Sequence, residues 1–366
     1  MNILTVSNMY PSEKNPEYGT FIKNFFENVK SLNTSGTNDL VIISGKRKGK
    51  LSKLFAYLRF YSGLTSKLLL RKYDLVYVHT ITFPIIPLRI ASTFRHIPIV
   101  FNVHGDDVLP SNRFKTMLKN IAPPLLRKAE LIVTPSEYFR GILHREFPGL
   151  DDSKIFTSPS GGIPEFFFKK KTIFNEGLNP YILGFVSRID PGKGWDTFVL
   201  AIKKLRLQGI NVIGKIIGDG SQTSHLLDMI EKEGQTEHIE YLGAKGQSEL
   251  PSFYNSFDLF IFPTSREAES LGLVGIEAMA AGTPVIAANI GGPAGYIQDG
   301  INGFLFEPRN VESLSNAVKK YIGLDLSAKK TMSEKAYNDA LGFETKSVMK
   351  ELYEVLDNIT IVEKKD

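Results

Sequence analysis

Short apolar runs, many of them rich in β-branched residues, recur along the chain, and each is followed by turn residues and then by a segment with helical spacing. Because the runs are nearly continuous in hydrophobicity rather than alternating, they indicate strands that are buried on both faces of a sheet. Strands that alternate with helices favour right-handed βαβ units and parallel sheets. The predicted strands cover residues 3–7, 40–44, 75–79, 99–104 and 131–135, and then 181–187, 211–218, 239–242, 259–263, 284–288 and 303–306.

The strand–helix pattern starts twice, at residue 3 and again at residue 181, with a polar stretch between the two series. We therefore predict two α/β domains of similar size, at residues 1–165 and 166–343. Residues 344–366 show helical spacing of apolar side chains and have no strand after them. They are predicted to form a helix that either closes the second domain or crosses back to pack on the first, and we favour the crossing.

Charge is distributed unevenly along the chain. The 366 residues have a net charge of +5, but residues 1–165 carry 22 basic and 13 acidic side chains, whereas residues 166–366 carry 22 basic and 26 acidic ones. Residues 46–72 contain nine Lys and Arg, no Asp or Glu, and apolar residues at largely helical spacing. Such a segment suits an anionic membrane surface, or it is a solvated helix whose apolar stripe packs on its own domain. The cations that would face a membrane are Lys46, Arg47, Lys48, Lys50, Lys53 and Arg59.

Several classes of protein are disfavoured by what the sequence lacks. It has no Cys, which excludes disulfides and thiolate nucleophiles. It has neither a His-Glu-x-x-His spacing nor an Asp-x-Asp pair, so no metal cofactor is expected. No stretch resembles a signal peptide or approaches the ~20 apolar residues of a membrane span. The basic segment carries no nucleic-acid motif. We expect a cytoplasmic protein, peripheral at the inner face of the plasma membrane if the basic segment binds lipid.

Ligands of open parallel sheets bind beyond the carboxyl ends of the strands, so the loops after the predicted strands are the candidate positions. In the first half, His104, Asp106 and Asp107 follow one strand. His79 ends another strand, where a single histidine is more often structural. Gly19 precedes a helix predicted at about residues 21–30, and a glycine there lets backbone N–H groups approach a phosphate.

In the second half, residues 187–194 (SRIDPGKG) place Arg188 and Lys193 in one loop directly after a strand. Two cations in one loop suit a diphosphate, which Arg can bind in bidentate fashion. Gly218 starts a partial dinucleotide fingerprint, but Thr223 occupies its third glycine position. A nicotinamide-dependent oxidoreductase is therefore disfavoured, and a tight turn without a ligand remains an alternative for Gly218.

Residues 263–284 (PTSREAESLGLVGIEAMAAGTP) carry the most informative pattern. Glu269 and Glu277 are separated by seven residues, the first in a loop after a strand and the second in the first turns of a predicted helix. Burying a carboxylate is costly unless it is paired, so hydroxyl groups of a sugar and a ribose are suitable partners. Taken singly, each glutamate could instead be an ordinary acid at a helix start.

This stretch resembles the E-x-seven-E signature of the retaining, nucleotide-sugar-dependent family-four glycosyltransferases. The resemblance continues in order along nearly the whole chain, through residues 10–21, 104–106, 158–164, 187–194 and 290–303. It implies a GT-B fold, in which two Rossmann-like domains face a central cleft, the first binding the acceptor and the second the nucleotide-sugar. The sequence departs from the family pattern in the first loop, which has one glycine where many members have two, and at Leu271, where Phe is common.

Carried over by residue, the resemblance implies that Arg188 and Lys193 bind the donor diphosphate and stabilise it as it leaves. Glu277 would accept from the ribose hydroxyls, Glu269 would face the transferred sugar, and His104 would contact that sugar near the reacting centre. The other donor-binding residues that it implies are Gly19, Gly218, Ser270, Leu271, Gly272 and Leu273, and the acceptor-side residues are Asp106 and Asp107.

The implied activity is retaining, metal-independent transfer of a sugar, from a UDP-sugar in preference to a GDP-sugar, to a glycan or lipid-linked acceptor in cell-surface polysaccharide synthesis. No residue is a convincing covalent nucleophile, which favours a front-face displacement in which the leaving phosphate takes the acceptor proton. A nucleotide-sugar 2-epimerase of the same fold is one alternative. A membrane- or nucleic-acid-binding protein without catalysis is the alternative from another class.

Overall fold

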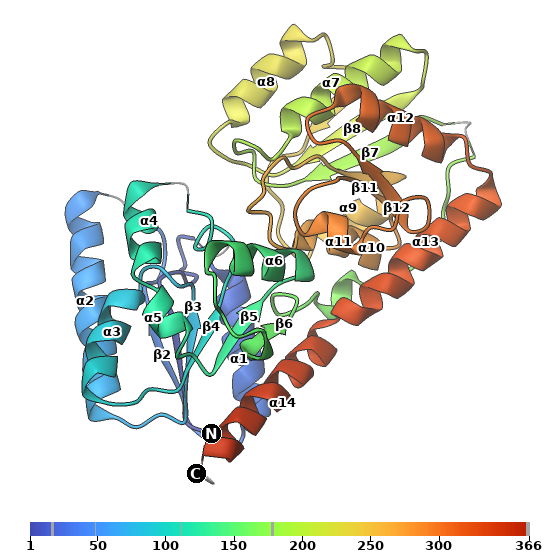
Figure 1. The fold of residues 1–366 in the computed structure, drawn as a ribbon. Helices are drawn as coiled ribbons and strands as arrows, with labels where there is room; N and C mark the ends of the chain where they lie inside the picture. Colours follow the sequence, from blue (N-terminus) through green and yellow to red (C-terminus); the bar gives the residue numbers. More distant parts are fainter. Residues whose placement is uncertain (16–17, 48, 111, 177–178, 364–366) are drawn as a thin grey trace. The chain divides into compact units, whose positions relative to one another are not determined.

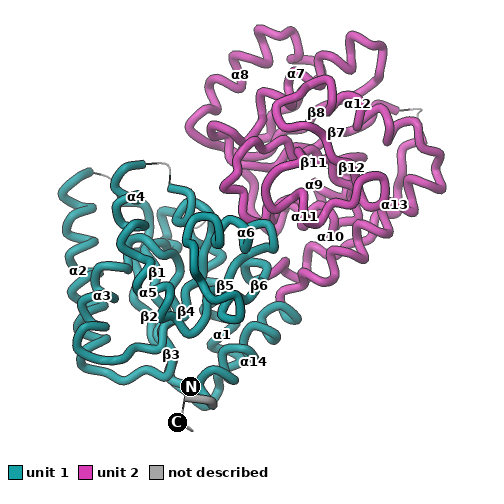
Figure 2. The backbone as a smooth tube through the Cα atoms, viewed as in Figure 1, with its two compact units in different colours: residues 1–161, 346–366 teal, residues 162–345 magenta. Residues whose placement is uncertain are grey.

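The computed structural model describes residues 1–15, 18–47, 49–110, 112–176 and 179–363. The chain forms two compact units, which Figure 2 shows in two colours. The first unit combines Met1–Gly161 with Lys346–Asp366, and the second is Gly162–Thr345. The predicted boundaries, after residues 165 and 343, differ from these by a few residues.

The first unit is built on a parallel six-stranded sheet in the order β2-β1-β3-β4-β5-β6 (Figure 1). Its strands are β1 (Ile3–Ser7), β2 (Asn38–Ile42), β3 (Leu75–His79), β4 (Ile99–Asn102), β5 (Leu131–Thr134) and β6 (Ile155–Thr157). Its helices are α1 (Thr20–Leu32), α2 (Lys50–Leu70), α3 (Ile85–Phe94), α4 (Arg113–Asn120), α5 (Pro123–Leu126), α6 (Glu137–Glu146) and nearly all of α14 (Thr345–Glu363), with a 3-10 turn at Asp152–Lys154.

Successive residues of a strand point to opposite faces of its sheet, and this period of two divides the core of the first unit into two clusters. Val76 and Val78 of β3 belong to the cluster covered by α2 to α6. Leu75 and Tyr77 of the same strand belong to the cluster covered by α1 and α14. The C-terminal helix therefore packs on the first sheet, which is the crossing that the sequence predicts.

The second unit has its own parallel six-stranded sheet, in the order β12-β11-β10-β7-β8-β9. Its strands are β7 (Tyr181–Val186), β8 (Val212–Ile217), β9 (Ile239–Tyr241), β10 (Leu259–Phe262), β11 (Val285–Ala288) and β12 (Gly303–Phe306). Its helices are α7 (Trp195–Leu207), α8 (Thr223–Lys232), α9 (Leu250–Ser256), α10 (Leu273–Ala280), α11 (Pro293–Tyr296), α12 (Val311–Ile322) and α13 (Leu326–Ala340), with 3-10 turns at Glu165–Phe167 and Leu341–Phe343.

The two faces of this second sheet are again buried under different helices. Residues of α7, α8 and α12 pack on one face, and residues of α9 and α10 with the end of α13 pack on the other. Every predicted strand is present, with ends that shift by two residues or fewer. The strand that the pattern missed is β6, which has three residues and pairs with β5 at the edge of its sheet, and is too short to stand out as an apolar run.

Candidate functional site

In the second unit, the order of the strands reverses between β7 and β10, which are neighbours in the sheet. Doubly wound sheets bind ligands at such a switch point, beyond the carboxyl ends of the strands. Since β10, β7 and β8 are adjacent, the loops that follow them lie at one edge. Arg188 and Lys193 follow β7, Gly218 follows β8, and Glu269 follows β10. The fold therefore brings together candidate residues that are up to 81 positions apart in the sequence.

Lys193 and Glu269 are in direct contact at this edge. Nζ of Lys193 lies 2.5 Å from Oε2 of Glu269, and the two side chains are 12% and 15% exposed. The Thr264 hydroxyl donates to the same carboxylate oxygen over 3.3 Å. The backbone also joins the two loops, because the Ser265 N–H donates to the Gly192 carbonyl over 2.9 Å. The cationic loop and the first glutamate of the signature thus form one site.

Arg188 is more exposed and is held by a different acid. Its Nη1 lies 2.9 Å from Oδ2 of Asp190, and its side chain is 66% exposed. Asp190 is anchored in turn, since its Oδ1 accepts hydrogen bonds from the backbone N–H and the hydroxyl of Ser221. Burial works against ionisation of Asp190, but the hydrogen bonds from Ser221 and the charges of Arg188 and Lys193 lower its pKa below the usual value. Arg188 is therefore a cation at the rim of the site.

Two of the predicted donor-binding residues need to be glycine for backbone reasons. Gly218 has a φ of 139°, and a Cβ there would lie 1.8 Å from the Ser187 carbonyl oxygen. Gly272, the N-cap of α10, has a φ of 79°, and a Cβ there would lie 2.6 Å from the Phe262 ring. These contacts account for both glycines without a ligand. Donor binding by them, and by Ser270, Leu271 and Leu273, stays a prediction.

Glu277 is buried in α10, and its Oε2 accepts a hydrogen bond of 2.9 Å from the Tyr254 hydroxyl. Burial raises the pKa of Glu277 to about 7, although the bond from Tyr254 works in the opposite direction. Tyr296 is half-buried, and this burial, together with the charges of Glu269 and Glu277, raises the pKa of its phenol well above the usual value. Its hydroxyl donates to the Gly272 carbonyl over 2.9 Å. Neither tyrosine belongs to a pattern that the sequence analysis singled out.

In the first unit, the strand order reverses between β1 and β3, and β3 is followed in the sheet by β4. Gly19 lies in the loop after β1, His79 is the last residue of β3, and His104 lies in the loop after β4. Gly19 has a φ of 78° as the N-cap of α1, and a Cβ there would lie 2.9 Å from the Met9 carbonyl carbon. The geometry requires a glycine at this turn. Its role toward a phosphate stays a prediction.

His104 is enclosed by aromatic rings. Its ring stacks on that of His79 with centroids 5.3 Å apart and an interplanar angle of 11°, and the Phe21 ring packs edge-on against it at 4.8 Å. Nδ1 of His79 and Nε2 of His104 are 3.1 Å apart. Burial lowers the pKa of His104 to about 4, so the imidazole is neutral near pH 7. The sequence assigned His79 a structural role, whereas the structure places it in direct contact with His104.

Asp107 connects the loops that carry the two histidines. Its Oδ1 accepts hydrogen bonds from the backbone N–H groups of His104 and Gly105, each over 3.0 Å, and its Oδ2 accepts one from the N–H of Ile81 over 3.1 Å. Burial raises the pKa of this carboxyl, and the backbone N–H groups of His104, Ile81, Gly105 and Asp107 itself oppose the rise. These contacts give the buried Asp107 carboxylate a structural function, and the acceptor-side role predicted for it stays a prediction. For Asp106 the prediction stands.

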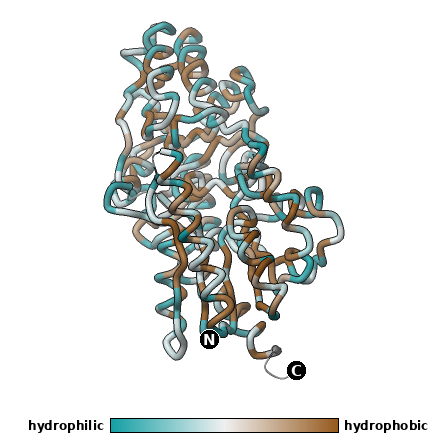
Figure 3. Tube along the Cα trace, turned by 90° about the vertical axis from the view of Figure 1, so that its left-hand side faces the viewer, coloured by the Kyte–Doolittle hydropathy of each residue, from teal (hydrophilic) through white to brown (hydrophobic). Residues whose placement is uncertain are grey.

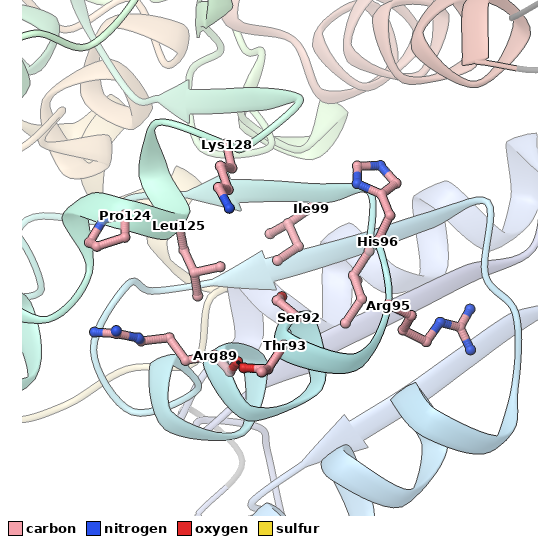
Figure 4. A pocket seen from close by; sticks show the side chains of 10 residues that line it. Arg89, Ser92, Thr93, Arg95, His96, Ile99, Pro124, Leu125 and Lys128 are labelled. Carbon is pink, nitrogen blue, oxygen red and sulfur yellow. Dashed lines mark hydrogen bonds between the residues drawn. The ribbon is translucent and has the colours of Figure 1, made fainter.

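A cavity of about 420 Å³ lies at the opposite edge of the first sheet, next to the start of β4 (Figure 4). Its lining includes Lys128 and His96, and Arg89 and Arg95 extend from it in opposite directions (Figure 4). Arg89 donates to the Ile121 carbonyl and Arg95 to the carbonyl of Arg71, so both guanidinium groups form hydrogen bonds with the backbone. The position at the amino ends of the strands separates this cavity from the candidate site.

Within the part of the chain that the structure describes, no group of three or more His, Asp or Glu side chains is placed to hold a metal ion. Within the same residues, no helix combines the length and the hydrophobicity that a membrane span requires.

Each unit is thus a doubly wound parallel sheet with candidate residues at its switch point, and two such units define the GT-B class of fold. Two family models match the chain. The model of glycosyltransferase family 4 matches residues 27–161, and that of the glycosyl transferases group 1 matches residues 166–339. The chain therefore belongs to the family-four glycosyltransferases.

Relatives with known names are similar over about half of the chain. A GDP-mannose-dependent alpha-(1-6)-phosphatidylinositol monomannoside mannosyltransferase of Mycobacterium tuberculosis is 29% identical over 180 residues, which are 48% of this chain and 45% of the relative. A D-inositol 3-phosphate glycosyltransferase of Salinispora arenicola is 28% identical over 184 residues, which are 48% of this chain and 40% of the relative. The match spans less than half the length of either relative.

Solved structures resemble nearly the whole chain in fold. HepE of Anabaena, in complex with UDP and glucose, has a TM-score of 0.76 and 19% identity, covering 98% of this chain and 100% of its own. Sucrose-phosphate synthase of Thermosynechococcus elongatus has a TM-score of 0.78 and 14% identity, covering 99% of this chain and 100% of its own. These likenesses support the GT-B fold.

Proposed function

We propose that this protein is a retaining, metal-independent glycosyltransferase that moves a sugar from a nucleotide-sugar to a glycan or lipid-linked acceptor in cell-surface polysaccharide synthesis. The observation that carries the proposal is the contact between Lys193 and Glu269, with Arg188 in the same loop, at the switch point of the second sheet. Membership in family four supports it.

The donor end of the proposed site combines two cations with two acids. Lys193 and Arg188 would bind the diphosphate, since they follow the same strand at the edge where ligands of such sheets bind. Glu277 would accept from ribose hydroxyls and Glu269 from hydroxyls of the transferred sugar. Lys193 and Arg188 are each paired with an acid, which keeps both cations at this end of the sheet.

Transfer with retention would proceed by front-face displacement. The bond between the anomeric carbon and the leaving phosphate oxygen breaks through an oxocarbenium-like state, and the acceptor oxygen bonds to the same face of the sugar. The departing phosphate oxygen accepts the proton of the acceptor hydroxyl. Positioned cations that stabilise this departing charge are the largest catalytic contribution to expect.

For the donor we favour a UDP-sugar. HepE, which has the same fold, is in complex with UDP and glucose, whereas the mycobacterial relative is named for GDP-mannose. A thermal-shift screen of UDP-sugars, GDP-sugars and NADH decides between these, because a ligand that binds the folded state raises the melting temperature by mass action. We expect the largest rise with a UDP-sugar and none with NADH.

The products then test the reaction. Proton NMR of the anomeric centre should show retained configuration, and inversion would contradict the proposed mechanism. Isomerised nucleotide-sugar formed without an acceptor would identify a 2-epimerase instead. A chain that binds no nucleotide-sugar at all would rule out the proposed function.

The proposed membrane role of the first unit rests on α2, whose two halves differ. The C-terminal half packs into the core and the N-terminal half exposes apolar residues at helical spacing; the buried residues are Phe60, Leu64 and Leu68, and the exposed ones Leu51, Leu54, Phe55 and Leu58. Figure 3, which colours the trace by hydropathy, shows hydrophobic and hydrophilic residues interspersed along the helices. Exposed cations accompany the apolar stripe, namely Lys46, Arg47, Lys50, Lys53 and Arg59, while Lys48 lies outside the described residues.

An apolar stripe flanked by cations suits an anionic bilayer, so we propose that this half of α2 binds the membrane from which a lipid-linked acceptor would come. Co-sedimentation with liposomes should increase with the fraction of anionic lipid and fall in a Phe55→Ser, Lys53→Glu variant. Lys232→Glu, which changes an exposed lysine of the second unit, is the matched control. Binding that is independent of anionic lipid would contradict this part of the proposal.

A further inference from the structure

His79 has one ring nitrogen that is buried without a hydrogen-bond partner, Nε2, and its side chain is 1% exposed. Its ring is enclosed by Phe25, which packs edge-on at 4.8 Å, by Tyr77 at 5.1 Å and by the stacked ring of His104. The other nitrogen, Nδ1, is 3.1 Å from Nε2 of His104. Neutral imidazole has one donor and one acceptor nitrogen, so this contact links the proton positions of the two rings.

Two arrangements of the proton are compatible with the contact. If Nε2 of His104 donates, Nδ1 of His79 accepts, and the proton of His79 must lie on Nε2, where it has no partner. If Nδ1 of His79 donates, its Nε2 carries only a lone pair, and His104 carries its proton on Nδ1. Buried donors without a partner are rarer than acceptors that lack one, so the second arrangement is favoured. Burial lowers the pKa of both imidazoles, which agrees with a neutral pair.

The surrounding backbone holds the two rings at this distance. Thr80, the residue after His79, has a φ of 79°, which is unfavourable for a β-branched residue and requires that its neighbours hold it there. Its N–H donates to the Asn102 carbonyl at the end of the next strand, over 2.9 Å. One residue further along, the N–H of Ile81 donates to Asp107, whose other oxygen holds the amide of His104. The loops of the two histidines therefore cannot move independently.

We infer that His79 is a positioning residue: it donates from Nδ1 to Nε2 of His104 and thereby fixes His104 as the neutral tautomer protonated at Nδ1. In that form His104 offers a hydrogen-bond donor at Nδ1 and cannot act as a base at Nε2. The tautomer is inferred from the contact between the two rings and does not depend on the proposed function. Its effect on sugar transfer rests on the proposed function.

Two substitutions separate donation by His79 from its bulk. In His79→Asn the amide nitrogen takes the place of ring Nδ1 and keeps a donor, whereas His79→Leu fills the space without one. Two-bond proton–nitrogen spectra of the histidine rings report each tautomer directly, and the signal of His104 is identified by its loss in His104→Asn. Melting temperatures of all variants establish that they are folded.

The wild-type protein and His79→Asn should show His104 protonated at Nδ1, and His79→Leu should show a mixture or the opposite tautomer. In transfer assays, kcat should fall about tenfold in His79→Leu and recover in His79→Asn, by analogy with the outer partners of metal-bound histidines, while the KM of the donor changes little. Protonation of His104 at Nε2 in the wild type, or a tautomer that His79→Leu leaves unchanged, would overturn the inference. If the wild type transfers no sugar, the proposed function fails and the spectra still decide the tautomer.

Discussion

The carboxyl edges of the two sheets are alike in topology and opposite in chemistry. Both place candidate residues in loops after three neighbouring strands at a switch point. In the second unit these residues are charged and paired with each other, as Lys193 is with Glu269. In the first unit the corresponding residues are the neutral imidazole rings of His79 and His104, and the nearby Asp107 carboxylate accepts hydrogen bonds from backbone N–H groups. The same fold can therefore present charge to a dianion at one edge and directional hydrogen bonds to hydroxyl groups at the other.

The largest effect should come from removing Lys193, the largely buried cation at the carboxyl ends of the strands in the second unit. Lys193→Ala should lower kcat/KM for sugar transfer about 100- to 1000-fold, because a positioned group that stabilises a developing charge contributes that much. Lys203→Ala is the matched control, since Lys203 pairs with Glu233 over 2.7 Å in the same unit but on α7, away from the edge. Steady-state kinetics on both variants gives the comparison, and equal activity would show that the charge of Lys193 is not used.

Glu277→Gln should separate stability from donor binding. A folded-state pKa of about 7 against 4.5 means that the folded protein binds this proton more tightly, so the contribution of Glu277 to stability is lost as the pH rises from 4.5 to 7. At pH 8 the variant should be more stable than the wild type by up to about 3 kcal/mol, and at pH 4 the difference should vanish.

Melting temperatures at pH 4 and pH 8 measure this effect, with Glu240→Gln as the control because that side chain is half-exposed. Donor affinity should fall in Glu277→Gln at pH 8 if the ionised carboxylate accepts from the ribose, and the difference should shrink at pH 4, where the wild-type carboxyl is protonated. A variant that loses stability at pH 8 would contradict the pKa shift.

Asp107→Asn tests the backbone role of the carboxylate at the neutral edge. The amide would keep an acceptor for His104 and Gly105 but turn a donor toward the N–H of Ile81, or the reverse. An unsatisfied buried donor should lower the free energy of unfolding by about 2 kcal/mol. Chemical denaturation measures the loss, and Asp106→Asn is the neighbouring control. A stable variant that has lost only acceptor affinity would contradict the structural function and support the acceptor-side role predicted for Asp107.

The smallest effect should be the response to salt, which distinguishes the two edges without mutation. Raising the ionic strength from about 0.1 M to 1 M shortens the Debye length from about 10 Å to 3 Å. Donor affinity should weaken a few-fold, mainly through the exposed charge of Arg188, and Arg188→Ala should be less sensitive. The tautomer signal of His104 should not change, since its ring pair is neutral and buried. Equal salt sensitivity of the wild type and Arg188→Ala would contradict the role given to Arg188.

The strands and the division into two units followed from apolar periodicity, because buried parallel strands are continuous apolar runs. The charged residues of the candidate site could also be selected from the sequence. Arg188, Lys193, Glu269 and Glu277 lie in loops or near helix starts after buried strands, where ligands of such sheets bind. Tyr254 and Tyr296 were not predicted, because a single tyrosine in a short helix gives the same sequence pattern whether its hydroxyl donates to a carboxylate, as that of Tyr254 does, to a carbonyl, as that of Tyr296 does, or to water.

The contact of His79 with His104 could not be predicted from the sequence either. Nothing in its own neighbourhood of the sequence distinguishes a structural histidine from one that contacts His104, since their contact is made between adjacent strands and depends on register. His79 pairs with Asn102 in the sheet, two residues before His104. The structural contacts of Asp107 could not be predicted for a related reason, since its partner Ile81 lies 26 residues away in the sequence.

The helix α14 has a consequence for the order in which the protein is made. The first unit takes Met349, Leu352 and Leu356 into its core, although these residues follow the entire second unit in the chain. Domains generally fold from the N-terminus during synthesis. Here residues 1–161 leave the ribosome with one face of their sheet incompletely covered, while the second unit can fold first. Leu352 also lines the small cavity beside His79 and His104. The histidine pair is therefore enclosed only after translation has passed residue 352, which delays completion of this site until the second unit has also been synthesised.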